Sequence, residues 1–346
     1  MEKVTMEQIA RLAGVSQATV SRAASGSGST SKINLEKIRA AMRELGCLQE
    51  FPIGESGKDT RNIGVIVPEI AKPFYARMIG QIEKYAAKKG YSILLGSSHT
   101  SPERERECIS AMELNRVDGI ILASVCREAL PCHLRLKKDK IPCVLFDEKI
   151  CGMDYDAGVF VDNEFAVFNA VDYLIRNRRY KIAFISGGEE HSVTKERLNG
   201  YRSALQLHGL NFDGSRIKYG QYSIRSGYRM VQELLQSRTD FTALVAGSDM
   251  VSLGAMQALK HYRVKIPEGV QVIGFDNAGL GEMVDPGLTA IVSPIAEMAR
   301  EAVECLACVM RGGALEGRDR RMDARLILRG STRAADDTNK TGSASA

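Results

Sequence analysis

The sequence predicts an α/β protein: a small N-terminal domain of three helices, then a core of two similar lobes, each built on a parallel sheet. Two observations carry this prediction. Apolar residues recur at helical spacing through residues 1–48. After Arg61, short β-branched runs alternate with helical stretches as far as residue 333. The 346 residues, 44% of them hydrophobic and 26% charged, suffice for two or three globular domains.

Residues 1–48 are predicted to form three short helices arranged around a helix-turn-helix. Thr5 is the expected N-cap of the first helix and Gly14 its stop, while Ser16 and Ser31 are expected to cap the second and third helices. The buried stripe of the third helix is expected to be Ile33, Ile38, Ala41, Met42 and Leu45. Small residues around Gly14 let two helices cross closely over a short turn. The spacing alone would also suit another small helical bundle.

The outward face of the second helix indicates a nucleic-acid partner. Ala18 is expected near the interface between the helices, while Gln17 and Arg22 point outward. Gln, Ser, Thr and Arg side chains are typical partners of base edges and phosphates in duplex DNA. Residues 1–48 also hold seven Lys or Arg and four Glu, and this surplus of three positive charges is more than half of the chain's net charge of +5. The sequence therefore predicts a DNA-binding domain.

The core is predicted from ten strand-like runs, in order NIGVIVP, YSILLGSS, VDGIILAS, IPCVLFDE, GVFVDN, KIAFISGG, RIKYGQ, FTALVAGSD, VQVIGFDN and LTAIVSP. Continuous apolar strands separated by helices favour parallel sheets that are covered on both faces. IGVIVP resembles IAFISG, and IPCVLFDE resembles VQVIGFDN, so two similar lobes are expected. Ligands of such sheets bind at the carboxyl ends of the strands, which places the expected site in the cleft between the lobes.

These motifs resemble the lactose-repressor (LacI) family of bacterial transcription regulators. AGVSQATVSR matches its helix-turn-helix, and VDGIILAS, RLNGY, SDMVSLGAMQAL, GFDN and RGSTR resemble its regulatory core, so that the likeness covers nearly the whole chain. The resemblance implies a type I periplasmic-binding-protein fold for residues 62–333. Lobe one would comprise about 62–162 plus 294–321, and lobe two about 163–291 plus 322–333. It also implies a repressor that binds a palindromic operator in double-stranded DNA as a homodimer, with its affinity controlled by a small-molecule effector.

Particular DNA contacts follow from the same resemblance. Gln17, Ala18 and Arg22 would read bases in the major groove, with the Ala18 methyl against a thymine. Phosphate contacts are implied for Thr5, Ser16, Thr19, Ser21, Ser31 and Asn34. The linker at residues 49–61 departs from the family's hinge helix, because Pro52 and Gly54 oppose a helix. We therefore expect the linker to stay irregular on DNA.

The resemblance also implies an effector site. Arg197 of RLNGY and Asp276 of GFDN match the family's most specific contacts, and their chemistry suits a polyol. The other expected contacts are Phe74, Asp147, Tyr222, Ser248 and Asp249. A sugar or sugar derivative is the expected effector. The alternatives are a nucleobase and a phosphorylated or acidic metabolite, the latter because Lys72 would add positive charge. Strand-end Asp residues could instead cap helices, and Arg197 could form a surface ion pair.

Other classes of protein explain less of the chain. A secreted solute-binding protein would account for residues 62–333 but not for the first 48 residues or the missing signal sequence. An enzyme would need a phosphate loop or a catalytic constellation, and the sequence has neither, so no catalytic residue, cofactor or metal is expected. The C-x-x-C of Cys305 and Cys308 lies in an amphipathic helical run, where packing is favoured over redox or metal chemistry.

Location and assembly are predicted from the remaining segments. No apolar stretch approaches the roughly 18 residues of a membrane helix, so the protein is expected in the cytoplasm with no membrane partner. The polar tail at residues 334–346 lacks heptads and is expected to be disordered. A dimer is therefore expected rather than a tetramer joined by a zipper.

Overall fold

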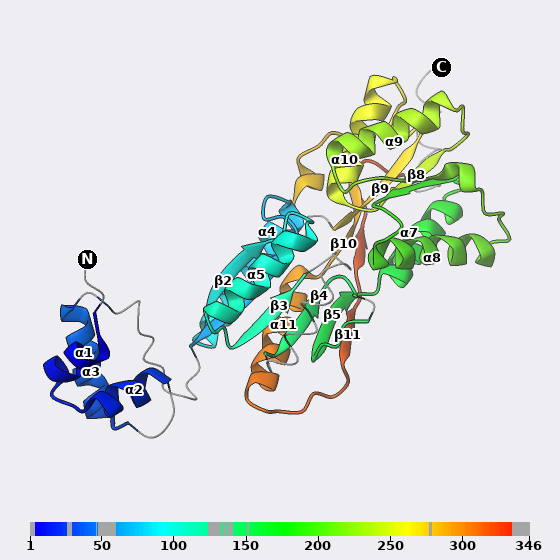
Figure 1. The fold of residues 1–346 in the computed structure, drawn as a ribbon. Helices are drawn as coiled ribbons and strands as arrows, with labels where there is room; N and C mark the ends of the chain where they lie inside the picture. The colour runs from blue at the N-terminus through cyan, green and yellow to red at the C-terminus, as the bar shows by residue number, and fades with distance from the viewer. Residues whose placement is uncertain are drawn as a thin grey trace, which may run out of the picture. The chain divides into compact units, whose positions relative to one another are not determined.

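The computed structural model describes residues 4–25, 30–45, 47, 60–123, 133, 136, 141–150, 152–276 and 279–333. They belong to two compact units, Met1–Thr60 and Arg61–Ala346 (Figure 1). Within the described ranges, no helix combines the length and the apolar character needed to cross a bilayer. The linker at residues 49–61 lies almost entirely outside the described residues, and so does the tail at 334–346.

The N-terminal unit contains the three predicted helices, α1 (Met6–Ala13), α2 (Gln17–Ser25) and α3 (Lys32–Glu44). Thr5 caps α1 in a capping box with Gln8, and Gly14 ends that helix in the left-handed conformation at φ 65°. The core between the helices is formed by Ile9, Val20, Ile38 and Met42, among others.

One expectation for α3 is wrong. Ile33 is 67% exposed, and Leu35, which is 6% exposed, contributes to the core instead. Leu35, Ile38 and Met42 follow one another at helical spacings of three and four residues. Ile33 precedes Ile38 by five residues, which turns its side chain about 140° away around the helix.

The second unit has two six-stranded sheets with the same order of strands. Sheet one, in the order β11-β5-β4-β3-β1-β2, contains β1 (Asn62–Val67), β2 (Ser92–Ser97), β3 (Gly119–Leu122), β4 (Cys143–Phe146), β5 (Ala157–Val161) and β11 (Asp319–Met322). Sheet two, in the order β12-β10-β9-β8-β6-β7, contains β6 (Ile182–Ser186), β7 (Ile217–Tyr219), β8 (Ala243–Ala246), β9 (Gln271–Asp276), β10 (Thr289–Val292) and β12 (Arg325–Ile327). All ten predicted strands are present, which confirms the predicted two-lobed core.

The pairing is parallel except at one edge, where β12 runs antiparallel to β10. Sheet one and its helices form lobe one, with α4 (Pro73–Lys88), α5 (Pro102–Leu114) and α11 (Ile295–Met310). Lobe two contains sheet two with α7 (Asn163–Arg176), α8 (Ser192–Leu207), α9 (Ile224–Gln236) and α10 (Asp249–His261). Short 3-10 turns, η2 (Gly214–Arg216) and η3 (Leu280–Glu282), complete lobe two.

The chain passes between the lobes three times. It leaves lobe one after β5 to form α7, returns after β10 to form α11, and crosses again between β11 and β12. After its crossing α11 packs on α4 and on strands β3, β4 and β5. The two lobes are therefore joined by three neighbouring segments, an arrangement that suits hinge motion between them.

Close packing of helices explains one conspicuous glycine. A Cβ on Gly254 of α10 would lie 2.0 Å from the backbone oxygen of Ile224 at the start of α9. Only a residue without a side chain allows these two helices to approach so closely. The pair covers one face of sheet two and fixes the position of the α10 N-terminus, which faces the cleft.

Candidate functional site

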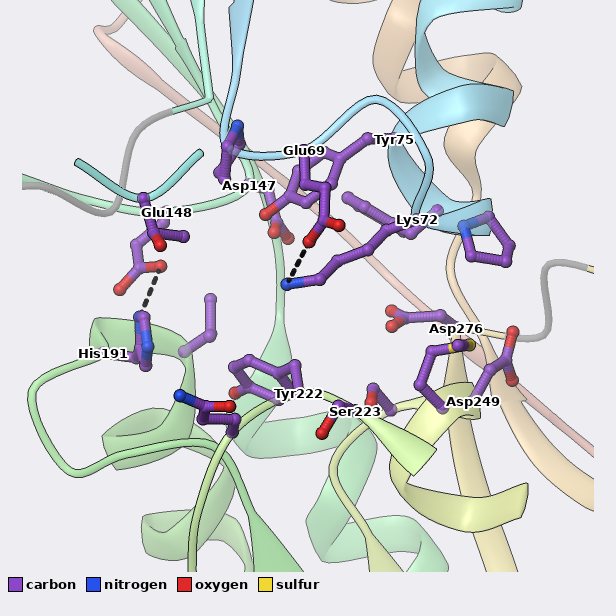
Figure 2. Close-up of a pocket in the computed structure, with 18 of the residues that line it drawn as sticks. Glu69, Lys72, Tyr75, Asp147, Glu148, His191, Tyr222, Ser223, Asp249 and Asp276 are labelled. Carbon is purple, nitrogen blue, oxygen red and sulfur yellow. Dashed lines mark hydrogen bonds and ion pairs between the residues drawn. The ribbon is translucent and has the colours of Figure 1, made fainter. Parts of the chain in front are cut away.

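A cavity of about 660 Å³ lies between the lobes at the carboxyl ends of the strands (Figure 2). Its lining includes all seven residues expected to hold an effector, namely Phe74, Asp147, Arg197, Tyr222, Ser248, Asp249 and Asp276. Phe74 and Asp147 come from lobe one and the other five from lobe two. The fold thus brings together residues that are up to 202 positions apart in the sequence.

Arg197 is buried beneath the cavity and held by three contacts. Arg197 is only 3% exposed, so it does not form an ion pair on the protein surface. Nε donates a hydrogen bond to Asn163 Oδ1 at 2.8 Å, and Nη1 donates to the backbone oxygen of Gly247. The guanidinium carbon lies 3.7 Å from the centroid of the Phe275 ring. Burial would lower the pKa of Arg197, but the neighbouring acidic groups raise it, so this side chain stays positively charged.

Asp147 and Asp276 occupy equivalent places in the two lobes. Asp147 follows β4 and Asp276 ends β9, and both have left-handed backbones, with φ of 70° and 82°. Ser293 donates a hydrogen bond to Asp276 Oδ1 at 3.3 Å. Burial raises the pKa of both carboxyls, that of Asp147 to about 7, although the charge of Arg197 opposes the shift. Strained backbones and raised pKa values are typical of functional sites.

Tyr222 forms part of the lobe-two wall. Its hydroxyl shares a hydrogen bond with Thr194 Oγ1 at 2.8 Å, and a Cβ on Gly187 would lie 2.2 Å from its ring. Burial raises the pKa of Tyr222, so the phenol is neutral near pH 7. The ring is therefore an uncharged aromatic part of the cavity lining, and its contact with a ligand stays a prediction.

The sequence did not single out the pair formed by Glu148 and His191, which joins the two lobes at the cavity (Figure 2). His191 Nδ1 lies 3.2 Å from Glu148 Oε2, and the Ser192 N–H donates to Glu148 Oε1 at 2.7 Å. The Lys149 N–H donates to Ser192 Oγ at 3.1 Å. Glu148 directly follows the candidate Asp147, and this adjacency was the one available signal.

The predicted DNA contacts lie on α2 and at the helix starts. Gln17, Ala18, Ser21 and Arg22 are all exposed on α2. Ala18 is therefore exposed, and the expectation that it lies near the helix interface is wrong, although an exposed methyl suits base contact. Ser16 Oγ accepts a hydrogen bond from the Thr19 N–H at 3.2 Å. The remaining predicted residues are Thr5 and Ser31, which cap α1 and α3, and Asn34, whose N–H donates to Ser31 Oγ.

The C-x-x-C lies inside α11. Cys305 is buried, and burial raises the pKa of its thiol to about 11, so the thiol is protonated and unreactive near pH 7. Cys308 Sγ lies 3.7 Å from the backbone oxygen of Ala314. Among the residues that the structure describes, no three His, Cys, Asp or Glu side chains are grouped so that they could hold a metal ion.

Comparison with known proteins agrees with both parts of the fold. Residues 5–47 match the family model of bacterial regulatory proteins of the lacI family, and residues 171–332 match that of the periplasmic binding protein-like domain. The HTH-type transcriptional repressor CytR of Escherichia coli (strain K12) is 35% identical over 332 residues, which cover 95% of this chain and 96% of CytR.

Two further likenesses extend over the same length. Catabolite control protein A of Priestia megaterium is 32% identical over 334 residues, covering 95% of this chain and 99% of that protein. The solved structure of the transcriptional regulator CelR in complex with cellobiose matches with a TM-score of 0.74 and 28% identity, covering 95% of this chain and 100% of that one.

The chain belongs to the LacI family of bacterial regulatory proteins. It is a sequence-specific DNA-binding transcriptional regulator, and the relatives that it matches are regulators rather than enzymes. The family and fold predicted from the sequence are confirmed.

Proposed function

We propose that the protein is a repressor that binds a palindromic operator as a homodimer and is controlled by a sugar or sugar derivative in the cavity between its lobes. The observation that carries this proposal is the gathering of seven predicted ligand contacts around one cavity. A volume of about 660 Å³ is within the usual range for small-molecule sites. The resemblance to CelR, solved with cellobiose, supports a sugar.

The lobes provide the route from ligand to DNA. A ligand can change affinity for an operator only if it prefers one arrangement of the protein over another. A ligand that contacts both Asp147 and Asp276 favours the arrangement in which these carboxyls are close. A coupling of roughly 1–3 kcal/mol between the two binding events is normal for such regulators. A homodimer supplies two recognition helices, which read half-sites about one helical turn apart.

Removing the N-terminal domain tests the DNA-binding half of the proposal. Deletion of residues 1–48 should abolish duplex binding and leave ligand binding unchanged. Fluorescence anisotropy on fragments of the host's promoters measures the first, and a thermal-shift screen of sugars measures the second. Binding of the intact protein should weaken steeply with salt, because phosphate contacts release counterions. Duplex affinity that persists in the deletion variant, or that ignores salt in the intact protein, contradicts the proposal.

Arg197 tests the ligand-binding half. Arg197→Ala should remove the ligand-induced rise in melting temperature. It deletes the charged hydrogen bonds that we expect between Arg197 and the ligand, which contribute about 1.5–3 kcal/mol each. Arg197→Lys keeps the charge but loses the planar fork, so it should recover only part of the affinity. The melting temperature of each variant without ligand separates lost binding from lost stability. A full thermal shift in a folded Arg197→Ala variant would show that the ligand binds elsewhere.

A further inference from the structure

Acidic side chains outnumber cations around the cavity. Among the described lining residues six are acidic, whereas only Lys72 and Arg197 carry a fixed positive charge. The acidic residues come from both lobes, as Figure 2 shows for most of them: Glu69, Asp147, Glu148, Glu190, Asp249 and Asp276. A ligand bearing a phosphate or a carboxylate would meet an excess of like charge here.

The cations of the cavity already have partners within the protein. Lys72 Nζ lies 3.5 Å from Glu69 Oε2. The ring of His191 has Glu148 at 3.2 Å on one nitrogen and Glu190 at 3.5 Å on the other. Arg197 uses two nitrogens for Asn163 and Gly247, as described above. Lys72 and His191 are therefore paired with Glu69, Glu148 and Glu190 rather than with the carboxyls of Asp147 and Asp276.

Asp147 and Asp276 have no such neighbour. Within the described part of the chain, no Lys, Arg or His nitrogen comes within 4 Å of either carboxylate. Burial raises the pKa of both; the charge of Arg197 opposes the rise, and at Asp147 the charge of Asp276 adds to it. Since the net shift is still upward, ionising both groups together is unfavourable. A positive group between them would relieve this penalty through its charge as well as through hydrogen bonds, whereas a neutral hydroxyl group offers hydrogen bonds alone.

Aromatic rings complete a surface suited to a cation. Phe74, Tyr75 and Tyr222 line the cavity, and Phe74 and Tyr75 pack edge to face at 5.3 Å between centroids. Burial raises the pKa of Tyr75 well above its ordinary value, so this phenol is also neutral. Neutral aromatic rings beside carboxylates are a common environment for ammonium groups in proteins.

We infer that the effector carries a protonated amine, as in an amino sugar or another aminated polyol, and that its ammonium group binds between Asp147 and Asp276 beside the aromatic rings. This inference rests on the proposed ligand-sensing role of the cavity. The inference narrows the class of effector to aminated compounds and excludes phosphorylated and acidic metabolites. The N-acetyl derivative of the same sugar, which keeps the ring but loses the charge, is the matched probe.

Titration calorimetry on the full-length protein tests the inference with glucosamine, galactosamine and mannosamine. Each is compared with its N-acetyl derivative and its parent hexose, and glucose 6-phosphate serves as the anionic probe. At least one amine should bind about tenfold or more tightly than both of its neutral counterparts, and the phosphate should not bind. Asp147→Asn should abolish this preference. Glu83→Gln, which removes a negative charge from an exposed position on α4, should leave it unchanged.

The pH dependence gives a second measurement. Burial raises the pKa of Asp147 to about 7; Arg197 opposes this rise, and Asp276, Glu148 and Glu196 add to it. Binding of an amine should therefore displace a proton from Asp147. Affinity for the amine should therefore rise roughly tenfold from about pH 5.5 to about pH 7, a range in which sugar amines stay mainly protonated. Affinity for the N-acetyl derivative should not change in this way, and Asp147→Asn should remove the pH dependence.

Two results would overturn the inference: binding of a parent hexose as tightly as its amine, or no binding of any of the three amines. The first result leaves the proposed function intact, because the cavity would still sense a sugar. Failure of the proposed function is seen separately, in operator affinity that no bound ligand changes.

Discussion

Glu148 is a single residue that acts on both lobes. It belongs to lobe one, yet its carboxylate accepts the Ser192 N–H at the start of α8 in lobe two. The N-cap residue of α8, His191, makes no capping hydrogen bond with its own side chain. A carboxylate at a helix N-terminus is stabilised by the helix dipole as well as by the hydrogen bond. The start of α8 therefore depends on a residue from the opposite lobe.

This contact predicts a pH-dependent stability. Burial alone would lower the pKa of His191, but the hydrogen bond and the charge of Glu148 outweigh it and raise the pKa; Glu190 acts with Glu148, and Lys72 acts against it. A raised histidine pKa stabilises the fold below the unfolded value of 6.5, and this contribution is lost as the pH rises through the folded value. The free energy of unfolding of the core should therefore include a term that falls between about pH 6 and about pH 8.

Glu148→Gln should remove that term and lower the stability at about pH 6 by about 2 kcal/mol, since charged hydrogen bonds are lost. Urea unfolding followed by circular dichroism at both pH values measures the effect. Glu297→Gln, at an exposed position in the first turn of α11, is the control and should keep the pH slope of the wild type. Equal pH slopes in Glu148→Gln and wild type would refute this account of His191.

The seven cavity residues could be predicted because strand ends and family motifs mark them individually. The Glu148–His191 contact could not be, because its members lie 43 positions apart and meet only when the lobes approach each other. Ile33 was assigned to the core because it is apolar, although its spacing from Ile38 is wrong for the buried face of α3. Prediction of a contact between two distant residues thus requires knowledge of the fold, whereas prediction of single positions at strand ends does not.

At the scale of elements, buried strands were the easiest to predict. β3, β4 and β8 are buried along their whole length, so their sequences are continuous apolar runs. β11 was missed, since its sequence DRRM has three charged residues. It lies at the edge of sheet one, where its side chains need not be buried, and is held by parallel pairing with β5. Backbone pairing at an edge leaves little trace in hydrophobicity.

Two helical glycines should respond to alanine in opposite ways. Gly80 of α4 has no atom within 4 Å of the place that a Cβ would take, so Gly80→Ala should stabilise the core by about 0.5–1 kcal/mol through helix propensity. Gly254→Ala should destabilise it by about 2 kcal/mol or more, because the new methyl group would overlap the backbone of α9. Chemical denaturation of the two variants measures the difference. A stabilised Gly254→Ala variant would mean that α9 and α10 separate easily.

For the whole molecule, the two compact units predict two unfolding events. A ligand in the cavity should stabilise the unit Arg61–Ala346 by about 2.7 kcal/mol at a hundredfold excess over Kd. The N-terminal unit should melt at the same temperature with and without ligand. Scanning calorimetry distinguishes the events, and a protein lacking residues 1–48 should lose the ligand-insensitive one. If both events shift equally with ligand, the units do not unfold independently.

The three passages between the lobes have a consequence for synthesis on the ribosome. Lobe one begins at β1 but lacks α11 and β11 until residues 295–322 have been made, so nearly the whole polypeptide must emerge before this lobe is complete. Domains usually fold as units when their last segment becomes available. The N-terminal DNA-binding domain of the nascent regulator can therefore fold long before the two-lobed core is complete.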